Sequence, residues 1–375
     1  MTAAAATGAE EARRVTPLEL FFDLVFVFVI TQLTSALAHR MTVGGALETL
    51  LVLGLIWWMY DGYAWLTNSV AADNAARRGL LLAAMAAFLV LALCVPRVFH
   101  GTGTAFGGAY LAVVLIHAGL YSRATAESIV RAIAQIARTN IAMALLILAG
   151  GIAGGTVQYV LWVAAFVLAW VGSRLSLPDG FAVSPAHFVE RHGLVVIVAI
   201  GESVVAVGIG AGDLAVDVGL VVVASLGLAL SACLWWAYFG VDNDVRVERA
   251  ISEAPPAARP RLALEAFGYW HLLLLLGIIV IAAGEEHAIA APGHALQLAD
   301  ALALGAGTAL YLIGDVLFRR TLGLGRAALR LAAAGAVLLT VPLGTEVTAS
   351  VQLAALVAVV GGALMLEASR TRTAP

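Results

Sequence analysis

Residues 56–62 read IWWMYDG, and residues 234–240 read LWWAYFG. The chain has only 8 Trp in 375 residues, so two copies of one WW-x-Y-x-G pattern indicate a common origin. Each copy follows a segment that begins with a hydroxyl residue and a proline, Thr16-Pro17 in the first half and Ser184-Pro185 in the second. Repetition of this kind sets the architecture of a chain. We therefore predict a tandem duplication with units at residues 1–175 and 176–375.

The composition indicates where such a duplicated chain resides. Apolar residues make up 62% of the chain and charged residues only 12%, and the mean hydropathy is +0.97. A soluble domain carries about 25% charged residues. A bilayer-spanning helix needs about 20 apolar residues, and in lipid the helix satisfies its own backbone hydrogen bonds. We therefore expect an all-α, polytopic membrane protein.

Hydrophobic segments of suitable length occur six times in each unit. The predicted spans are residues 18–38, 45–66, 79–97, 104–121, 139–155, 157–173, 193–210, 217–239, 262–284, 298–318, 328–343 and 349–366. The fifth and eleventh are the shortest. The sequence thus predicts about twelve transmembrane helices in two six-helix repeats.

Arginine predicts the orientation of these spans. All 21 basic residues are Arg, and only Arg40 and Arg97 fall on the side opposite the others. By the positive-inside rule both termini are cytoplasmic, in a multi-pass protein of the cell membrane. Six spans per repeat make the repeats parallel, with Asp213 and the pair Glu285–Glu286 in loops on the opposite side.

Several other classes of protein are disfavoured. The formal net charge of −3 gives no basic surface for nucleic acid. Cys94 and Cys233 both fall inside predicted spans, which argues against disulfides and cysteine-based zinc sites. The pattern His187-x-x-Glu190-x-His192 lacks the His spacing of a metalloprotease helix. We therefore expect no cofactor, no bound metal and no enzymatic activity.

The first span carries two carboxylates near its start. Glu19 and Asp23 are four residues apart and share one helix face. Near a helix N-terminus a carboxylate can simply complement the helix dipole, which we hold equally open for Glu19. Asp23 lies one turn deeper and needs an Arg, a water-filled path or a proton. We expect a polar network that holds or gates the helices.

The seventh span holds the strongest candidate site. Glu202 lies among apolar residues, and a carboxylate in hydrocarbon usually faces a cavity or a pathway. Alignment of the two repeats pairs Glu202 with Gln32, so Thr31, Gln32, Glu202 and Ser203 are the predicted pathway residues. The alternative is that Glu202 only links neighbouring helices through hydrogen bonds.

Charged residues also precede this predicted span. Glu190, Arg191 and His192 form its polar entrance, and Arg191 is available to a carboxylate such as Glu19 or Asp23. These three residues complete the predicted gating network.

Two stretches carry a family resemblance. Residues 16–28, TPLELFFDLVFVF, together with HFVERHGL at 187–194 and IGES at 200–203, resemble the bacterial low temperature requirement A (LtrA) family over essentially the whole chain. This resemblance implies a multi-pass bacterial membrane protein associated by name with growth in the cold. It implies no biochemical activity.

The first span also resembles, more distantly, the first helix of the endolysosomal potassium-channel family. Those proteins consist of six-helix units whose first helix carries Phe-Ser-Asp and lines a central pore. Phe22 replaces the Ser here, and the seventh span has no Phe-x-Asp triplet. The resemblance implies a homodimer with four such helices around one axis.

Together these patterns predict an ion channel or an ion-coupled transporter. A small cation or a proton would move along the first and seventh spans in the lipid bilayer. The transporter form places the pathway within one chain, near the bilayer midplane. The alternative is a non-transporting membrane sensor or assembly protein involved in low-temperature growth.

Overall fold

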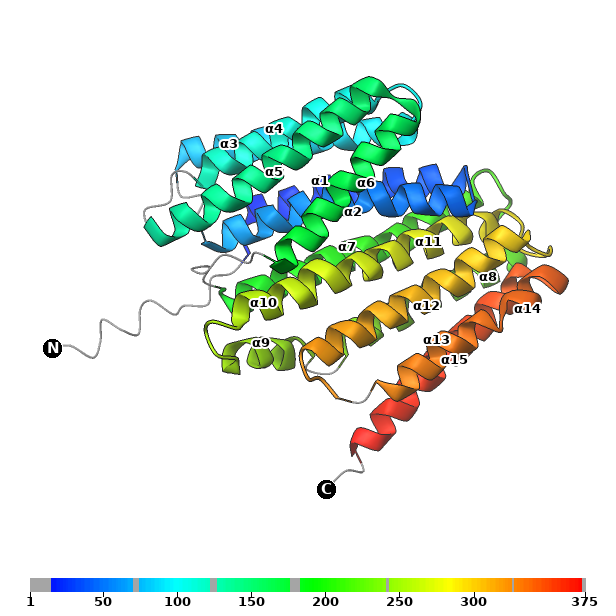
Figure 1. Ribbon diagram of the computed structural model, residues 1–375. Helices are drawn as coiled ribbons and strands as arrows, with labels where there is room; N and C mark the ends of the chain where they lie inside the picture. The colour runs from blue at the N-terminus through cyan, green and yellow to red at the C-terminus, as the bar shows by residue number, and fades with distance from the viewer. Residues whose placement is uncertain are drawn as a thin grey trace.

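The structure is a computed structural model that describes residues 15–69, 74–121, 127–175, 183–240, 243–325 and 327–372. Within these residues the fold is all-helical (Figure 1). The first half contains α1 (Pro17–Ala38), α2 (Val43–Ser69), α3 (Ala75–Cys94) with the short turn η1 (Val95–Arg97), α4 (Gly103–Tyr121), α5 (Glu127–Ala153) and α6 (Gly155–Leu175).

The second half has six spans and additional short helices. These helices are α7 (Pro185–Ala211), α8 (Val218–Phe239), α9 (Asn243–Glu253), α10 (Arg259–Ala263), the π-helix η2 (Leu264–Tyr269), α11 (Trp270–Ala290), α12 (Leu298–Thr321), α13 (Ala328–Leu338), α14 (Val341–Glu346) and α15 (Ala349–Arg372). Here α10, η2 and α11 form one continuous span, and α13 and α14 form another.

The described residues contain 12 helical segments long and apolar enough to cross a membrane, which confirms the predicted number. The eleventh span is interrupted between α13 and α14. Pro342 stands in the first turn of α14, and it has no backbone N–H with which to continue a helix.

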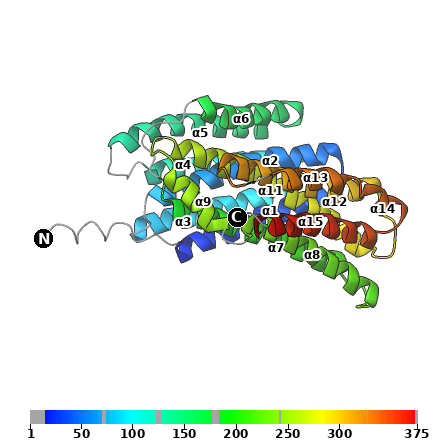
Figure 2. The ribbon, with the colours of Figure 1, turned by 90° about the horizontal axis from the view of Figure 1, so that it is seen from below.

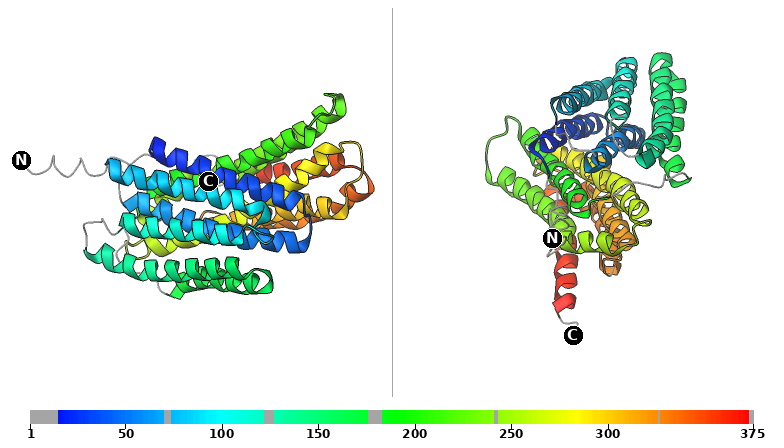
Figure 3. Two further views of the ribbon diagram at one scale, coloured as in Figure 1. Left: turned by 90° about the horizontal axis from the view of Figure 1, so that it is seen from above. Right: turned by 90° about the vertical axis from the view of Figure 1, so that its left-hand side faces the viewer.

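All spans run roughly along one axis, so the bundle has two ends (Figure 1). The proximal end is the one at which α1 begins and α15 ends, and the distal end is opposite. Seen end-on, the α5–α6 pair lies at one edge of the bundle, and α15 lies at the opposite edge (Figure 3). The distal part of the second half, from α7 to α8, projects beyond its neighbours (Figure 2). Which membrane face the proximal end occupies stays a prediction.

The centre of the bundle is the span that ends in α11. In its most apolar stretch 83% of the residues are buried, against 22% in α6. Small residues bring α11 close to α12, because a Cβ on Gly277 would lie 2.9 Å from the carbonyl oxygen of Gly307. Close backbone approach at small residues is the usual way in which helices associate in lipid. α1, α2 and α7 pack around the same centre.

The ends of several predicted spans differ from the structure, and two of them bear on the site. The seventh was expected from residue 193, but α7 begins at Pro185, so His187 and His192 lie inside it and are buried. The ninth was expected to stop at residue 284, but α11 continues to Ala290, and Glu285 is fully buried instead of lying in a loop. A prediction from hydropathy alone ends each span where polar residues appear. In the fold, His187 and His192 stay inside the helix because carboxylates pair with them, and Glu285 packs against Gly227.

Candidate functional site

A buried ion cluster joins α1 to α7 near the proximal end. The guanidinium of Arg191, with 1% of its side chain exposed, lies 3.2 Å from Glu19 Oε1 and 3.0 Å from Asp23 Oδ1. His187 Nε2 donates to Glu19 Oε1 at 3.1 Å. Arg191 was expected to be available to a carboxylate such as Glu19 or Asp23, and in the structure it lies within ion-pair distance of both.

Local sequence explains how Glu19 is positioned. Thr16 is the N-cap of α1, and its backbone N–H donates to Glu19 Oε2 at 2.8 Å. This capping box uses Oε2 of Glu19 and leaves Oε1 for α7. Glu19 thus combines the two roles held open for it, a helix cap and a member of the ion cluster.

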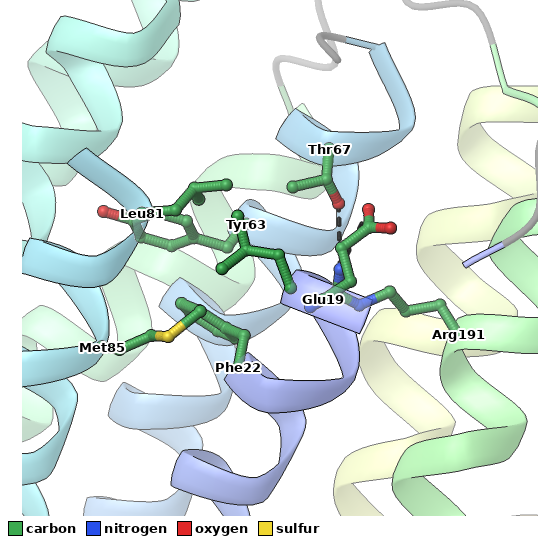
Figure 4. Close-up of a pocket in the computed structure, with 8 residues that line it drawn as sticks. Glu19, Phe22, Tyr63, Thr67, Leu81, Met85 and Arg191 are labelled. Atoms are coloured by element: carbon green, nitrogen blue, oxygen red, sulfur yellow. Dashed lines mark hydrogen bonds and ion pairs between the residues drawn. The ribbon is translucent and has the colours of Figure 1, made fainter. Parts of the chain in front are cut away.

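The helix α2 supplies the third side of this cluster. Tyr60 donates its hydroxyl hydrogen to Asp23 Oδ1, and Arg191 donates to Thr67 Oγ1 at 3.1 Å. Figure 4 shows Glu19, Thr67 and Arg191 converging at a narrow pocket that Phe22 and Tyr63 line from the apolar side. The other oxygen of Asp23 has no hydrogen-bond partner among the described residues.

A second buried pair lies on the neighbouring faces of α2 and α7. His192 Nε2 lies 3.0 Å from Asp61 Oδ1, and His192 Nδ1 lies 2.9 Å from the carbonyl oxygen of Phe188. A neutral imidazole has only one N–H, whereas a carbonyl and a carboxylate can only accept. The geometry therefore places one additional proton on the His192–Asp61 pair, on the imidazole or on the carboxyl.

The π-helix η2, which precedes α11, brings its own backbone close to Trp57 and Asp61 of α2. Trp57 Nε1 donates to the Gly268 carbonyl at 2.8 Å, and a Cβ on Gly268 would lie 3.3 Å from Asp61 Oδ2. His271, one turn further, accepts from the Tyr238 hydroxyl at 2.8 Å. Single-turn π-helices frequently occur at functional sites, where they reorient side chains and carbonyls.

We call the side chains of Glu19, Asp23, Tyr60, Asp61, His187, Arg191 and His192 the proximal cluster. The cluster contains three carboxyl groups and one guanidinium. With all four groups ionised and both imidazoles neutral, its net charge would be −2. Two additional protons, bound to imidazoles or carboxylates, make the cluster neutral. Glu190, predicted as a member, is exposed, and its hydrogen bond within the described residues is the one accepted from the Val15 backbone N–H at 3.2 Å.

A distal site lies farther along α1 and α7. Thr31 Oγ1 donates to Glu202 Oε2 at 2.6 Å, and the Glu202 side chain is buried with 1% exposed. The 11 residues from Arg191 to Glu202 correspond to about 16 Å of helix rise. Two residues that were predicted to share a pathway, Thr31 and Glu202, are thus in direct contact across the α1–α7 interface.

The second carboxyl of the distal site comes from α11 and escaped prediction. Glu285 is fully buried, and a Cβ on Gly227 of α8 would lie 3.4 Å from its Oε1. Ser203 is a polar neighbour of Glu285, but neither side chain makes a hydrogen bond of good geometry among the described residues. Because Glu285 was expected in a loop, its position next to Ser203 of α7 was not predicted.

Gln32 is separated from this contact. It is half-buried, and no hydrogen bond connects it to Glu202 or to any other described group. On α1 it follows Thr31 by about 100° of rotation, so it faces a different neighbour. The predicted equivalence of Gln32 and Glu202 within two repeats stays untested.

A further charge cluster that sequence reasoning missed lies between α8, α12, α13 and α15. Asp315 accepts from Arg319 at 3.3 Å and also from Arg330, and Arg330 donates to Glu367 at 2.8 Å. Both arginines also donate to the Ala237 carbonyl near the end of α8. Arg319 lies just after the predicted tenth span and Arg330 at the start of the predicted eleventh, and both are buried.

No group of three or more His, Cys, Asp or Glu side chains with metal-binding geometry occurs in the described part of the chain. The proximal cluster and the distal site instead combine carboxylates with imidazole, hydroxyl and guanidinium groups in membrane-length helices. Such groups can hold and pass protons.

Comparison with known proteins places the chain in a family. The sequence profile of the bacterial low temperature requirement A protein (LtrA) matches residues 14–365. An uncharacterized protein of Rhizobium meliloti (strain 1021) is 29% identical over 316 residues, which cover 80% of this chain and 76% of that protein. With its 12 candidate spans, the chain is a multi-pass membrane protein that belongs to the bacterial LtrA family.

Proposed function

We propose that the chain is an ion-coupled transporter that moves protons along the interface of α1, α7 and α11. The observation that carries this proposal is the contact of the buried Glu202 with Thr31 between apolar helices. A second buried carboxyl, Glu285 of α11, has Ser203, the residue after Glu202, as a polar neighbour. Ionisable groups inside membrane spans commonly mark ion pathways and proton relays.

The hydrogen-bond geometry favours a proton over a metal cation. The Thr31 hydroxyl has one hydrogen but two acceptors, Glu202 Oε2 at 2.6 Å and the Val27 carbonyl at 3.3 Å. A protonated Glu202 would donate to Thr31 and release that hydrogen for Val27. Hard cations such as calcium require six or more oxygen ligands, whereas a proton needs one donor and one acceptor.

The proximal cluster supports the same assignment. The His192–Asp61 pair carries one proton more than its acceptors alone would provide, and Asp23 retains an unused oxygen. We assign this cluster as the second proton-binding station. The helix rise of about 16 Å between the stations exceeds a hydrogen-bond length several times, so transfer between them requires water or helix movement.

The location of Glu202 supports a pathway inside one chain. Its hydrogen-bond partner Thr31 belongs to the same chain, and only 1% of Glu202 is exposed. A channel shared by two subunits would instead orient this carboxyl toward the subunit boundary. We therefore favour the transporter form over the dimeric channel form.

Flux from proteoliposomes tests this function. Purified protein is reconstituted with a pH-sensitive dye inside, and separate proton, sodium and potassium gradients are imposed without and with a mixture of small solutes. We expect protein-dependent proton movement that Glu202→Gln reduces at least about 10-fold, the equivalent of about 1.4 kcal/mol.

The matched control is Asp213→Asn, which removes an exposed acid after α7 and leaves both clusters intact. It should transport like the original protein. Absence of proton movement under every gradient and solute would contradict the proposal, and so would equal flux in Glu202→Gln.

A second function deserves a separate test, because the proximal cluster also links α1, α2 and α7 through Arg191. A non-transporting membrane sensor or assembly protein would need such links without any flux. In that case Glu202→Gln lowers the melting temperature in detergent while flux is absent from both proteins.

A further inference from the structure

A cavity of about 450 Å³ opens at the distal end, and none of its lining residues belongs to the proximal cluster or to the Thr31–Glu202 contact. It lies between the end of α1, the start of α2 and the connection from α3 to α4. Among its lining residues are Leu33, His39, Arg40, Glu48, Phe99 and His100. Sites for small molecules typically have volumes of about 300–1,000 Å³, apolar walls and a few oriented polar groups.

Opposite charges stand side by side in this cavity. Arg40 Nη2 donates to Glu48 Oε1 at 2.7 Å, and Tyr159 donates to the same oxygen at 2.6 Å. The contact uses one of the five N–H donors of the guanidinium, and Glu48 Oε2 accepts no hydrogen bond from a described residue. The side chains are 44% and 18% exposed, so a ligand can reach both.

The two charged residues occupy a fixed turn. A Cβ on Gly45 would lie 2.3 Å from the Arg40 carbonyl oxygen, so only glycine allows this close approach. Thr42 caps the start of α2 through the Gly45 N–H at 3.0 Å. The hydrogen bond with Glu48 also raises the pKa of Arg40, which keeps the guanidinium charged.

Apolar side chains form a large part of the remaining wall, beside His39 and His100. Phe99 stacks on Tyr159 with ring centroids 4.6 Å apart and 6° between planes. Leu33, Val52 and Val95 lie in the same wall and are buried. Such a surface favours an aliphatic group, at about 25 cal/mol for each Å² of apolar area removed from water.

We propose that this cavity binds a small zwitterion with an aliphatic side chain, of the α-amino acid type. The carboxylate of the ligand accepts from Arg40, its ammonium donates to Glu48, and its side chain packs on Leu33 and Phe99. Because the charges of Arg40 and Glu48 balance each other, a ligand of zero net charge leaves no charge uncompensated.

The inference concerns binding and stands apart from the proton pathway. One connection between them is geometric: Ser35 lines the cavity and lies one turn after Thr31 on the same face of α1. Binding without proton movement would leave this inference intact and contradict the proposed function. Proton movement without binding would support the proposed function and contradict this inference.

Equilibrium binding to the purified full-length chain tests the proposal. The probes are leucine, 4-methylpentanoate, which lacks the amine, and isoamylamine, which lacks the carboxylate. Glycerophosphoethanolamine represents a lipid headgroup with the same pair of charges. We expect leucine to bind at least about 10-fold more tightly than each of the other three, a difference of about 1.4 kcal/mol.

Two variants test the two charged residues of the site separately. Arg40→Gln and Glu48→Gln should each weaken leucine binding at least about 10-fold, while Asp213→Asn leaves it unchanged. The melting temperature of each variant in detergent is measured alongside, because a partly exposed ion pair contributes little to stability.

Three results would overturn the proposal: no leucine binding by the original protein, equal binding of the amine or the acid, or unchanged binding in both variants. Tighter binding of glycerophosphoethanolamine than of leucine would also overturn it, because the site would then recognise a lipid headgroup.

Discussion

At the scale of single residues, Arg191 of α7 connects the proximal cluster to both α1 and α2. It donates to Asp23 and Thr67, and it lies 3.2 Å from Glu19. Buried charges of this kind depend on one another, since removal of one partner leaves the others uncompensated. In α7 the residues on either side of it, Glu190 and His192, face solvent and Asp61 respectively.

Arg191→Gln should therefore destabilise the fold strongly. The change leaves the carboxylates of Glu19 and Asp23 buried without a guanidinium, at a cost of about 3–5 kcal/mol. Thermal unfolding in detergent measures the loss. Arg249→Gln on the exposed face of α9 is the control and should stay within about 0.5 kcal/mol of the original protein. Equal melting temperatures for both variants would contradict the assigned role of Arg191.

Thr31→Val tests the residue that contacts Glu202. Valine keeps the shape of threonine but has no hydroxyl, so Glu202 loses its 2.6 Å hydrogen bond. We expect proton flux to fall about 10-fold, the equivalent of about 1.4 kcal/mol, and Thr31→Ser to retain it. A merely structural threonine would give the opposite pattern, in which valine is tolerated.

At the scale of secondary-structure elements, the sequence predicted the spans well and their ends less well. Apolar stretches located all 12 spans because length and hydropathy suffice for a helix in lipid. The start of α7 and the end of α11 were missed, since His187 and Glu285 look like loop residues until their neighbours are known. The π-helix η2 carries no comparable signal in its sequence.

Prediction of the site was limited because the sequence does not show which side chains of different helices lie next to each other. Glu202 and Asp23 were identified because a carboxylate among apolar residues is conspicuous in any sequence. Arg191 and Thr31 were also named from the sequence, but their contacts with Asp23 and Glu202 follow from the packing of α1 on α7. Tyr60 of α2, which donates to Asp23, was not predicted. The ion pairs of Arg319 and Arg330 with Asp315 were not predicted, because a side-chain charge alone does not reveal an opposite charge on another element.

The contact between α11 and α12 offers a prediction at this scale. A Cβ on Gly277 would lie 2.8 Å from the Tyr311 backbone nitrogen and 2.9 Å from the Gly307 carbonyl oxygen. Gly277→Ala should push these helices apart and cost about 1–3 kcal/mol in unfolding free energy.

The control for that prediction is Gly335→Ala in α13, where a Cβ meets no atom within 4 Å. Alanine should there stabilise the helix by about 0.5–1 kcal/mol. Melting temperatures that move in the same direction for both variants would contradict the close packing of α11 on α12.

At the scale of the whole molecule, the distribution of charge predicts the orientation in the membrane. Exposed Arg249 lies on the proximal α9 and exposed Asp213 at the distal end after α7. In cells that express single-cysteine variants at these positions, a membrane-impermeant maleimide should label position 213 in intact cells. Position 249 should react only after permeabilisation. The reverse pattern would place the proximal end outside.

The distance between the two stations has a consequence for the whole bundle. A carrier must expose the proximal cluster and the Glu202 site to opposite solutions in turn, and the span centred on α11 is the packed element between α7 and α12. We therefore expect transport, unlike passive leakage, to depend on movement of α1 and α7 relative to α11.

The most direct test of the central claim is the reversal potential of the protein-dependent current under crossed proton and potassium gradients, with solutes equal on both sides. A proton pathway predicts a shift of about 59 mV for each pH unit, the value for one charge and a tenfold concentration ratio. The potassium gradient should then have no effect. A reversal potential that follows potassium and ignores pH would contradict the account and favour a channel related to the potassium-channel family.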